Sequence, residues 1–196
     1  MTIGILGGTG DFGRGLATRL RTLGEDVLVG SRTPREGVVA NAEAATRAEL
    51  VFLSVPPTGV ESTARDLAAE LAGRIVVSVA SPVVFRDGRP SLDPGERSLA
   101  ETAAEAAPEA RVVAGFHTIA AKALARPDPL DEDVLLCGDD ADAKATVARL
   151  AERIVAGRAL DCGRLEAAGW LETLTALLLT INKNYKSETG VRITGL

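Results

Sequence analysis

Short runs of consecutive apolar residues alternate along the chain with longer stretches in which apolar residues recur at helical spacing. The apolar runs cover residues 3–6, 27–30, 50–55, 75–79, 111–114 and 134–137. Runs that are apolar throughout are typical of parallel strands that helices cover on both faces. The pattern therefore predicts an α/β fold with a doubly wound, mostly parallel sheet.

Helical spacing predicts helices between these strands. One apolar face comprises Phe12, Leu16, Leu20 and Leu23, and a second comprises Val60, Ala64, Leu67, Ala68 and Leu71. A third, near the end of the chain, comprises Trp170, Leu174, Leu177, Leu178 and Ile181. No strand follows this last helix, so we expect it to pack back on the sheet as a cap.

Polar residues mark where some helices begin. Residues 58–61 and 98–101 have the spacing of a capping box, in which a Ser or Thr is followed three residues later by Glu. After the sixth strand, Asp139 and Asp140 fit two roles, capping of a helix or metal binding, and we favour capping. No Cys or His pair has metal-ligand spacing, and we expect Cys137 and Cys162 to be buried free thiols.

Composition narrows the possible functions. The 196 residues are 46% hydrophobic and 25% charged, as in ordinary globular proteins, with a net charge of -5. The basic residues are scattered, so no stripe predicts nucleic-acid binding. No apolar run approaches the roughly 20 residues of a membrane helix, and the first residues form no positively charged leader. We therefore expect a cytoplasmic protein with neither nucleic acid nor membrane as a partner.

The segment Gly8-Thr9-Gly10-Asp11-Phe12-Gly13 follows the first predicted strand and opens the first predicted helix. In that position it matches the GxGxxG fingerprint of Rossmann dinucleotide-binding domains. The first glycine permits a tight turn, the second lets a pyrophosphate approach the backbone, and the third lets the helix lie close to the strand. We therefore interpret residues 1–162 as a Rossmann dinucleotide-binding domain. Residues 163–196 are interpreted as a small C-terminal helical cap, joined without a flexible linker.

The residues at the end of the second predicted strand indicate whether NAD or NADP binds. An Asp or Glu at this place would bind the ribose 2′-hydroxyl of NAD, but the chain reads Gly30-Ser31-Arg32. A hydroxyl and a guanidinium suit the 2′-phosphate of NADP. Arg35 is a candidate for a second positive charge. For both arginines the alternative is a side chain that lies in solvent at a turn.

Later loops follow strands at the edge of the sheet where ligands bind in open α/β folds. They make Val55, Pro56 and Ala80 candidate cofactor-binding residues. His117, the only histidine, is a candidate residue lining the site, and no residue is assigned a catalytic role with certainty. No metal is expected.

Together these segments resemble the NADPH-dependent reductases of the deazaflavin coenzyme F-420, the F-420:NADP oxidoreductase family. The resemblance extends over nearly the whole chain and rests on residues 4–10, 30–32, 96–98, 117–119, 137–140 and 190–193. It implies reversible hydride transfer between NADP and the deazaflavin by a cytoplasmic enzyme that is usually a homodimer. By the same resemblance, the deazaflavin site is walled by the final segment together with His117, Thr118 and Ile119.

Two alternatives remain open. One is an NADPH-dependent reductase of another acceptor, such as a flavin, a ferric chelate or a small imine, because acceptor loops diverge on this fold. The other is a sensor that binds NADPH without turnover. The scarcity of acid and base groups at the expected site favours ring-to-ring hydride transfer, which requires stacking and water exclusion more than a proton donor. Only His117, Lys122 and Lys183 are candidates for proton transfer.

Overall fold

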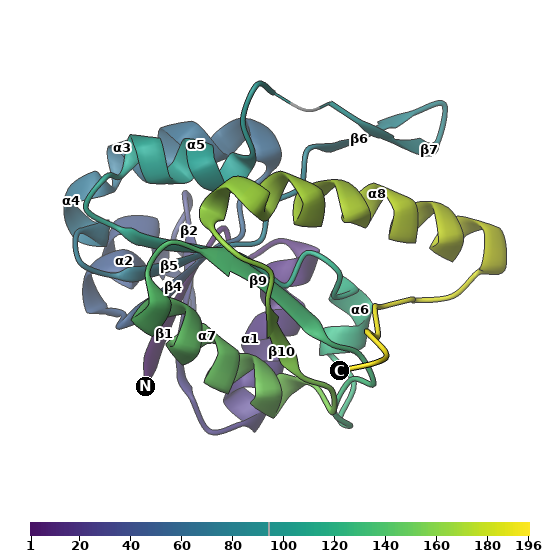
Figure 1. Ribbon diagram of the computed structural model, residues 1–196. Helices are drawn as coiled ribbons and strands as arrows, with labels where there is room; N and C mark the ends of the chain where they lie inside the picture. The colour runs from purple at the N-terminus through teal and green to yellow at the C-terminus, as the bar shows by residue number, and fades with distance from the viewer. Residues whose placement is uncertain (94) are drawn as a thin grey trace.

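The computed structural model describes residues 1–93 and 95–196, which form one eight-stranded sheet with helices on both faces (Figure 1). Its strand order is β10-β9-β8-β5-β4-β1-β2-β3. The strands are β1 (Thr2–Leu6), β2 (Asp26–Ser31), β3 (Val39–Ala40), β4 (Leu50–Leu53), β5 (Ile75–Ser78), β8 (Arg111–Gly115), β9 (Val134–Gly138) and β10 (Ala159–Asp161). All neighbours pair in parallel except β8 and β9, which are antiparallel. The predicted doubly wound, mostly parallel sheet is therefore confirmed.

The helices divide between the two faces of the sheet. They are α1 (Asp11–Thr22), α2 (Asn41–Arg47), α3 (Val60–Asp66), α4 (Ala68–Leu71), α5 (Leu99–Ala106), α6 (Ala121–Leu124), α7 (Ala141–Ile154) and α8 (Ala168–Tyr185), with short 3-10 turns η1 (Pro57–Gly59) and η2 (Leu165–Ala167). Successive β4 side chains enter opposite clusters, since Phe52 packs with α1, α6 and α7, whereas Val51 packs with the other helices. This double coverage explains why the strands carry apolar residues at every position.

The strand order reverses at β1. The chain runs outward from β1 through β2 to β3 on one side, and from β1 through β4, β5 and β8 on the other. At such a switch point the loops after neighbouring strands diverge and leave a crevice at their carboxyl ends. The fold thus places the glycine-rich segment after β1 at the edge where ligands bind.

Several details differ from the sequence-based predictions. The face predicted from Val60 to Leu71 belongs to two helices, because Leu67 takes φ -113° and ψ 17° and separates α3 from α4. The capping box predicted at Thr58 is wrong, since a 3-10 turn occupies 57–59 and α3 begins without a side-chain cap. The box at Ser98 is confirmed.

Beyond the sixth predicted strand, one aspartate caps a helix and its neighbour does not. Asp140 caps α7 by accepting the amide of Ala143 at 2.8 Å. Asp139 instead accepts a hydrogen bond from Arg164 at 3.0 Å. Among the described residues there is no cluster of acidic, Cys or His side chains suited to a metal.

The predicted inner face of α8 is confirmed only in part. Leu178 is buried as predicted, but Trp170 and Leu177, also expected to face the sheet, are 75% and 57% exposed, and Leu171 is buried although it lies outside the predicted face. Both sides of this helix are apolar. The orientation is fixed by Glu172, whose buried carboxylate accepts hydrogen bonds from the first amides of α5, at 2.9 and 3.0 Å. None of the helices within the described ranges has the length and apolarity needed to cross a membrane.

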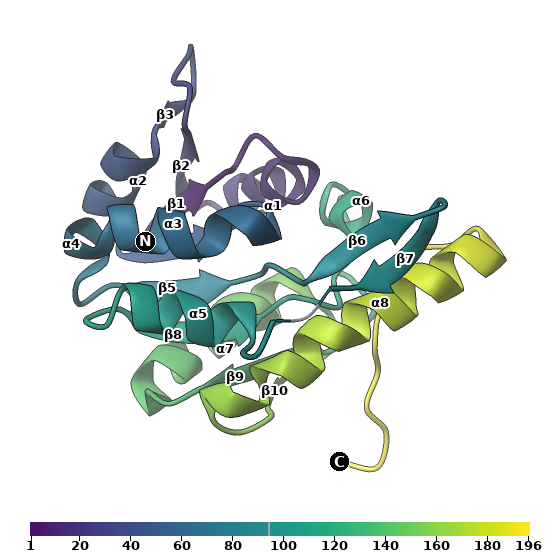
Figure 2. The ribbon, with the colours of Figure 1, turned by 90° about the horizontal axis from the view of Figure 1, so that it is seen from above.

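The far half of α8 lies beside an antiparallel hairpin that the sequence pattern did not reveal (Figure 2). The hairpin consists of β6 (Val83–Arg86) and β7 (Arg89–Leu92). Lys183 donates a hydrogen bond to the carbonyl oxygen of Gly88 at its tip, at 2.7 Å. The hairpin and α8 therefore stand together at the side of the molecule opposite β2 and β3.

Candidate functional site

A groove of about 1740 Å³ runs along the carboxyl ends of β1, β2, β4, β5 and β8 and reaches α8. It joins the loops that the sequence singled out, because all the candidate cofactor-binding residues line it except Gly8, Gly13 and Arg35. Those that line it are Thr9, Gly10, Asp11, Phe12, Ser31, Arg32, Val55, Pro56, Ala80, His117, Thr118 and Ile119. One continuous space thus connects the β2 end of the sheet to the cap helix.

The two glycines outside the groove support the turn that shapes it. A Cβ on Gly13 would lie 2.5 Å from the Cα of Gly8, so helix α1 can approach the turn only without side chains there. The Gly8 amide donates to the Ile5 and Gly30 carbonyl oxygens at 3.1 and 2.9 Å. The tight turn itself is made by Gly7, at φ 72°, and not by Gly8 as the fingerprint suggested.

Gly10 leaves the start of α1 open. It is the N-cap residue, and no side chain in the described part of the chain accepts a hydrogen bond from the first-turn amides. A Cβ on Gly10 would have the carbonyl oxygen of Gly7, at 3.6 Å, as its nearest neighbour, so the space above it is free. Unpaired amides and the helix dipole make this point suitable for a phosphate.

At the β2 end of the groove, Ser31 is half-buried and Arg32 is exposed. The hydroxyl of Ser31 accepts the Thr33 amide at 3.1 Å, which fixes the turn that presents Arg32. Within the described ranges Arg32 forms no ion pair, so its guanidinium is available to an anion. Arg35 lies outside the groove lining, where its backbone pairs with Val38.

Asn41 also lines the β2 end of the groove, although it was not predicted from the sequence. Its Oδ1 accepts the Gly7 amide at 3.2 Å and would lie 2.7 Å from a Cβ on Gly30. It therefore fixes the glycine turn against β2. A polar residue at the first position of a short helix carried no pattern that could have revealed this contact.

His117 lies at the middle of the groove, just after β8. Its Nε2 is 3.1 Å from the Ala80 carbonyl oxygen, so Nε2 carries the proton and donates it. Burial lowers the pKa of His117 to about 4, which leaves the ring neutral at physiological pH. Its Nδ1 is buried and has no hydrogen-bond partner within the described residues.

Apolar side chains surround His117. Val55, Pro56 and Ile119 line one part of the groove, and Leu178 and Leu179 of α8 line another. The backbone before His117 is strained, because Phe116 takes φ 65°. The ring of Phe116 packs edge to face on Phe52 at 5.4 Å between centroids, which holds this strained turn in place.

Basic side chains mark the end of the groove near α8. Lys122, Arg126 and Lys186 line it, whereas Lys183, considered alongside Lys122, points to the hairpin. Arg126 pairs with Glu188, which also lines the groove. An anionic ligand group would meet positive charge at this end.

Comparison with known proteins agrees with this geometry. The family described as NADP oxidoreductase, coenzyme F-420-dependent, matches residues 2–82. The F-420-dependent NADP reductase of Methanocaldococcus jannaschii is 38% identical over 222 residues, covering 100% of this chain and 99% of that protein. The metalloreductase STEAP3 of Rattus norvegicus is 37% identical over 187 residues, which cover 90% of this chain and 37% of that protein.

A solved structure is similar over its whole length. The crystal structure of a proposed F-420-dependent NADP reductase from Arthrobacter sp. FB24 has a TM-score of 0.88 to this chain and 30% identity, with 100% of both chains covered. Both the sequence and the fold therefore match from end to end. This chain belongs to the family of F-420-dependent NADP reductases.

Proposed function

We propose that this protein transfers hydride reversibly between NADP(H) and the deazaflavin coenzyme F-420. The observation that carries the proposal is the single groove, which runs from an unpaired arginine past an open helix start to an apolar region with one neutral histidine. Such a groove can hold a dinucleotide and a second ring system end to end. Family membership supports the same pair of co-substrates.

The NADP half of the groove follows from the contacts available. Gly10 and the free amides of α1 receive the pyrophosphate, with Thr9, Asp11 and Phe12 around it. Ser31 and Arg32 receive the 2′-phosphate, where a charge-assisted hydrogen bond discriminates NADP from NAD. When bound, the reduced nicotinamide supplies the hydride.

The acceptor half lies beyond Pro56. Val55 and Pro56 provide an apolar wall on the nicotinamide side, and His117, Thr118 and Ile119 line the opposite part. These residues orient two stacked rings and exclude water, which is what transfer of hydride between ring carbons requires. The neutral His117 keeps its one ring proton on Nε2, where it is bonded to the Ala80 carbonyl oxygen, and holds no proton at Nδ1 to donate. The proton that completes reduction of the deazaflavin therefore comes from Lys122, which lines the groove, or from solvent, and not from His117.

Turnover with a panel of acceptors tests the proposal. Protein and NADPH are mixed with oxidised deazaflavin, a flavin or ferric citrate, and oxidation of NADPH is followed together with the absorbance of each acceptor. We expect rapid reduction of the deazaflavin alone. Preferred reduction of the flavin or ferric citrate contradicts the proposed substrate, and tight NADPH binding without turnover identifies a sensor.

We also propose a homodimer formed through α8. Its outer face exposes Trp170, Leu177 and Tyr185, which are 75%, 57% and 77% exposed. A row of large apolar side chains on a helix that lines the groove suits a second copy of the chain. Analytical ultracentrifugation should give twice the 20.3 kDa chain mass, and Leu177→Glu should give the monomer. A wild-type monomer at micromolar concentration would exclude this interface.

The two parts of the chain bind different co-substrates in this proposal. We propose that residues 1–162 bind the dinucleotide and that residues 163–196 cap the acceptor end, because α8 and segment 186–189 contribute only there. We propose a cytoplasmic location, where a water-soluble coenzyme pair such as NADPH and a deazaflavin would meet the enzyme.

A further inference from the structure

The chain reverses direction after α8 and returns to the sheet. Lys186 takes φ 51°, and the segment that follows it runs back toward β10 (Figure 1). Residues 186–189 line the groove, and residues 191–193 reach the beginning of β9. One short segment thus connects the wall of the acceptor site with the beginning of β9.

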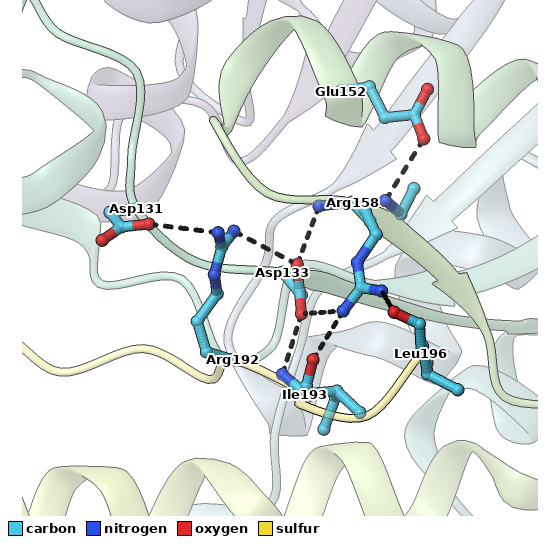
Figure 3. A network of polar contacts seen from close by, with 8 residues as sticks. Asp131, Asp133, Glu152, Arg158, Arg192, Ile193 and Leu196 are labelled. Carbon is cyan, nitrogen blue, oxygen red and sulfur yellow. Dashed lines mark hydrogen bonds and ion pairs between the residues drawn. The ribbon is translucent and has the colours of Figure 1, made fainter.

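A buried carboxylate holds this segment (Figure 3). The side chain of Asp133 is completely buried and accepts the amides of Arg158 and Ile193, both at 2.8 Å. The guanidinium groups of Arg158 and Arg192 approach it at 3.3 and 3.5 Å. The Asp133 amide donates to the Val191 carbonyl oxygen at 2.7 Å. The hydrogen bonds from the amides of Arg158 and Ile193, together with the Arg158 guanidinium, lower the pKa of Asp133 to about 2. We call this set of contacts the clasp.

Glycines let the chain pack closely beside the clasp. A Cβ on Gly190 would lie 1.7 Å from a carboxylate oxygen of Glu132, so the segment rests directly on that side chain. A Cβ on Gly157 would lie 2.1 Å from the Glu132 carbonyl oxygen. Both the hydrogen bonds and the close packing therefore fix where residue 190 lies.

The groove wall is fixed from its other end as well. Asn182 of α8 accepts the amide and the hydroxyl of Thr189, both at 2.7 Å. Glu188 pairs with Arg126, which follows α6 and lines the groove. Residues 186–189 are thus held between the end of α8 and the clasp, and Figure 2 shows that the far end of α8 lies on the opposite side of the molecule from β2.

We infer that Asp133 is a positioning residue for the acceptor, acting through the C-terminal segment that it holds. The clasp keeps residues 186–189 in place as the wall of the deazaflavin end, and it does not touch the NADP end. Affinity for the deazaflavin therefore depends on the clasp, while affinity for NADPH does not. This inference rests on the proposed function.

Asp133→Asn tests the inference, with Asp131→Asn as the matched control. The amide side chain keeps the shape of Asp133, but it removes the charge and turns a donor toward the donors it faces. We expect the KM for the deazaflavin to rise at least about tenfold, with kcat and the Kd of NADPH changed less than about twofold. Asp131 is 86% exposed and approaches only Arg192, at 3.6 Å, so the control should match the wild type. An equal loss of NADPH affinity, or an unchanged KM, overturns the inference.

A second variant covers the case in which Asp133→Asn does not fold. A chain ending at Gly190 removes the segment that the clasp holds, and it should show the same rise in KM. Where Asp133→Asn does fold, adding it to the shortened chain should raise the KM no further, because both changes release the same segment. A further rise in the double variant would show that Asp133 acts in another way.

A measurement without turnover completes the test. Trypsin should cleave after Lys186 and Arg192 faster in Asp133→Asn than in the wild type, as followed by mass spectrometry. Faster cleavage with an unchanged KM overturns the positioning role. Wild-type protein that binds neither co-substrate refutes the proposed function instead, so the two failures are distinguishable.

Discussion

Gly10→Ala should separate the stability of the protein from its ability to bind NADPH. Gly10 takes φ -71° and ψ 170°, an ordinary extended conformation that alanine adopts without strain. The added Cβ would meet only the Gly7 carbonyl oxygen, at 3.6 Å. Alanine reduces the freedom of the unfolded chain, which stabilises by about 0.4–1 kcal/mol, but it is a poorer N-cap than glycine by a similar amount. The two effects oppose each other, so the free energy of unfolding should change by less than about 1 kcal/mol.

The affinity for NADPH should change much more than the stability. The new methyl group occupies the space through which a pyrophosphate approaches the amides of α1. Losing one charge-assisted hydrogen bond costs about 1.5–3 kcal/mol, which corresponds to a Kd for NADPH raised roughly 10- to 100-fold. Urea unfolding followed by circular dichroism gives the stability, and isothermal titration calorimetry gives the Kd.

Gly13→Ala is the control for the same loop. Its Cβ would lie 2.5 Å from the Cα of Gly8, so this variant should be destabilised by about 1–3 kcal/mol. Only Gly10→Ala should keep full stability while losing affinity. An unchanged Kd for NADPH in folded Gly10→Ala would refute the assignment of the pyrophosphate to this loop.

Three further changes test other parts of the account. Arg32→Ala should weaken NADPH relative to NADH by about 2–3 kcal/mol in calorimetry, and equal weakening of both would argue against the 2′-phosphate site. His117→Ala should raise the KM for the deazaflavin more than the Kd of NADPH, and the reverse ranking would move this residue to the NADP half. Burial raises the pKa of Glu132 from 4.5 to about 7, so its contribution to stability is complete below pH 4.5 and is lost as the pH rises through 7. Between pH 4.5 and pH ~8, the free energy of unfolding of Glu132→Gln should therefore fall by about 3 kcal/mol less than that of the wild type. Urea unfolding of both proteins over this pH range measures the difference, and equal falls would contradict the prediction.

The sequence was sufficient for six of the eight strands of the sheet and for the loops that line the groove, whereas the short edge strands β3 and β10 were not predicted. Runs of apolar residues located the six central strands because helices cover both faces of each one. The glycine fingerprint located the ligand edge because close packing at Gly13 admits no side chain. The residue that makes the tight turn was harder to predict, since any of three neighbouring glycines could have taken the positive φ found at Gly7.

Other features depend on contacts between distant segments. The inner face of α8 was predicted only in part because both sides of the helix are apolar, and the buried Glu172 fixes the orientation by accepting the first amides of α5. The clasp joins Asp133 to Arg158 and to the segment around Ile193. Nothing in the local pattern distinguishes Asp133 from an exposed aspartate such as Asp131, so only the fold reveals its role.

NADPH deuterated at either face of nicotinamide C4 tests whether hydride passes directly from the nicotinamide to the deazaflavin. The label should appear in the reduced deazaflavin with one of the two stereoisomers, as read by mass spectrometry of the product. This result requires both rings to be held together in the groove. Reduced deazaflavin without deuterium from either isomer, or no reduced deazaflavin at all, would contradict the account.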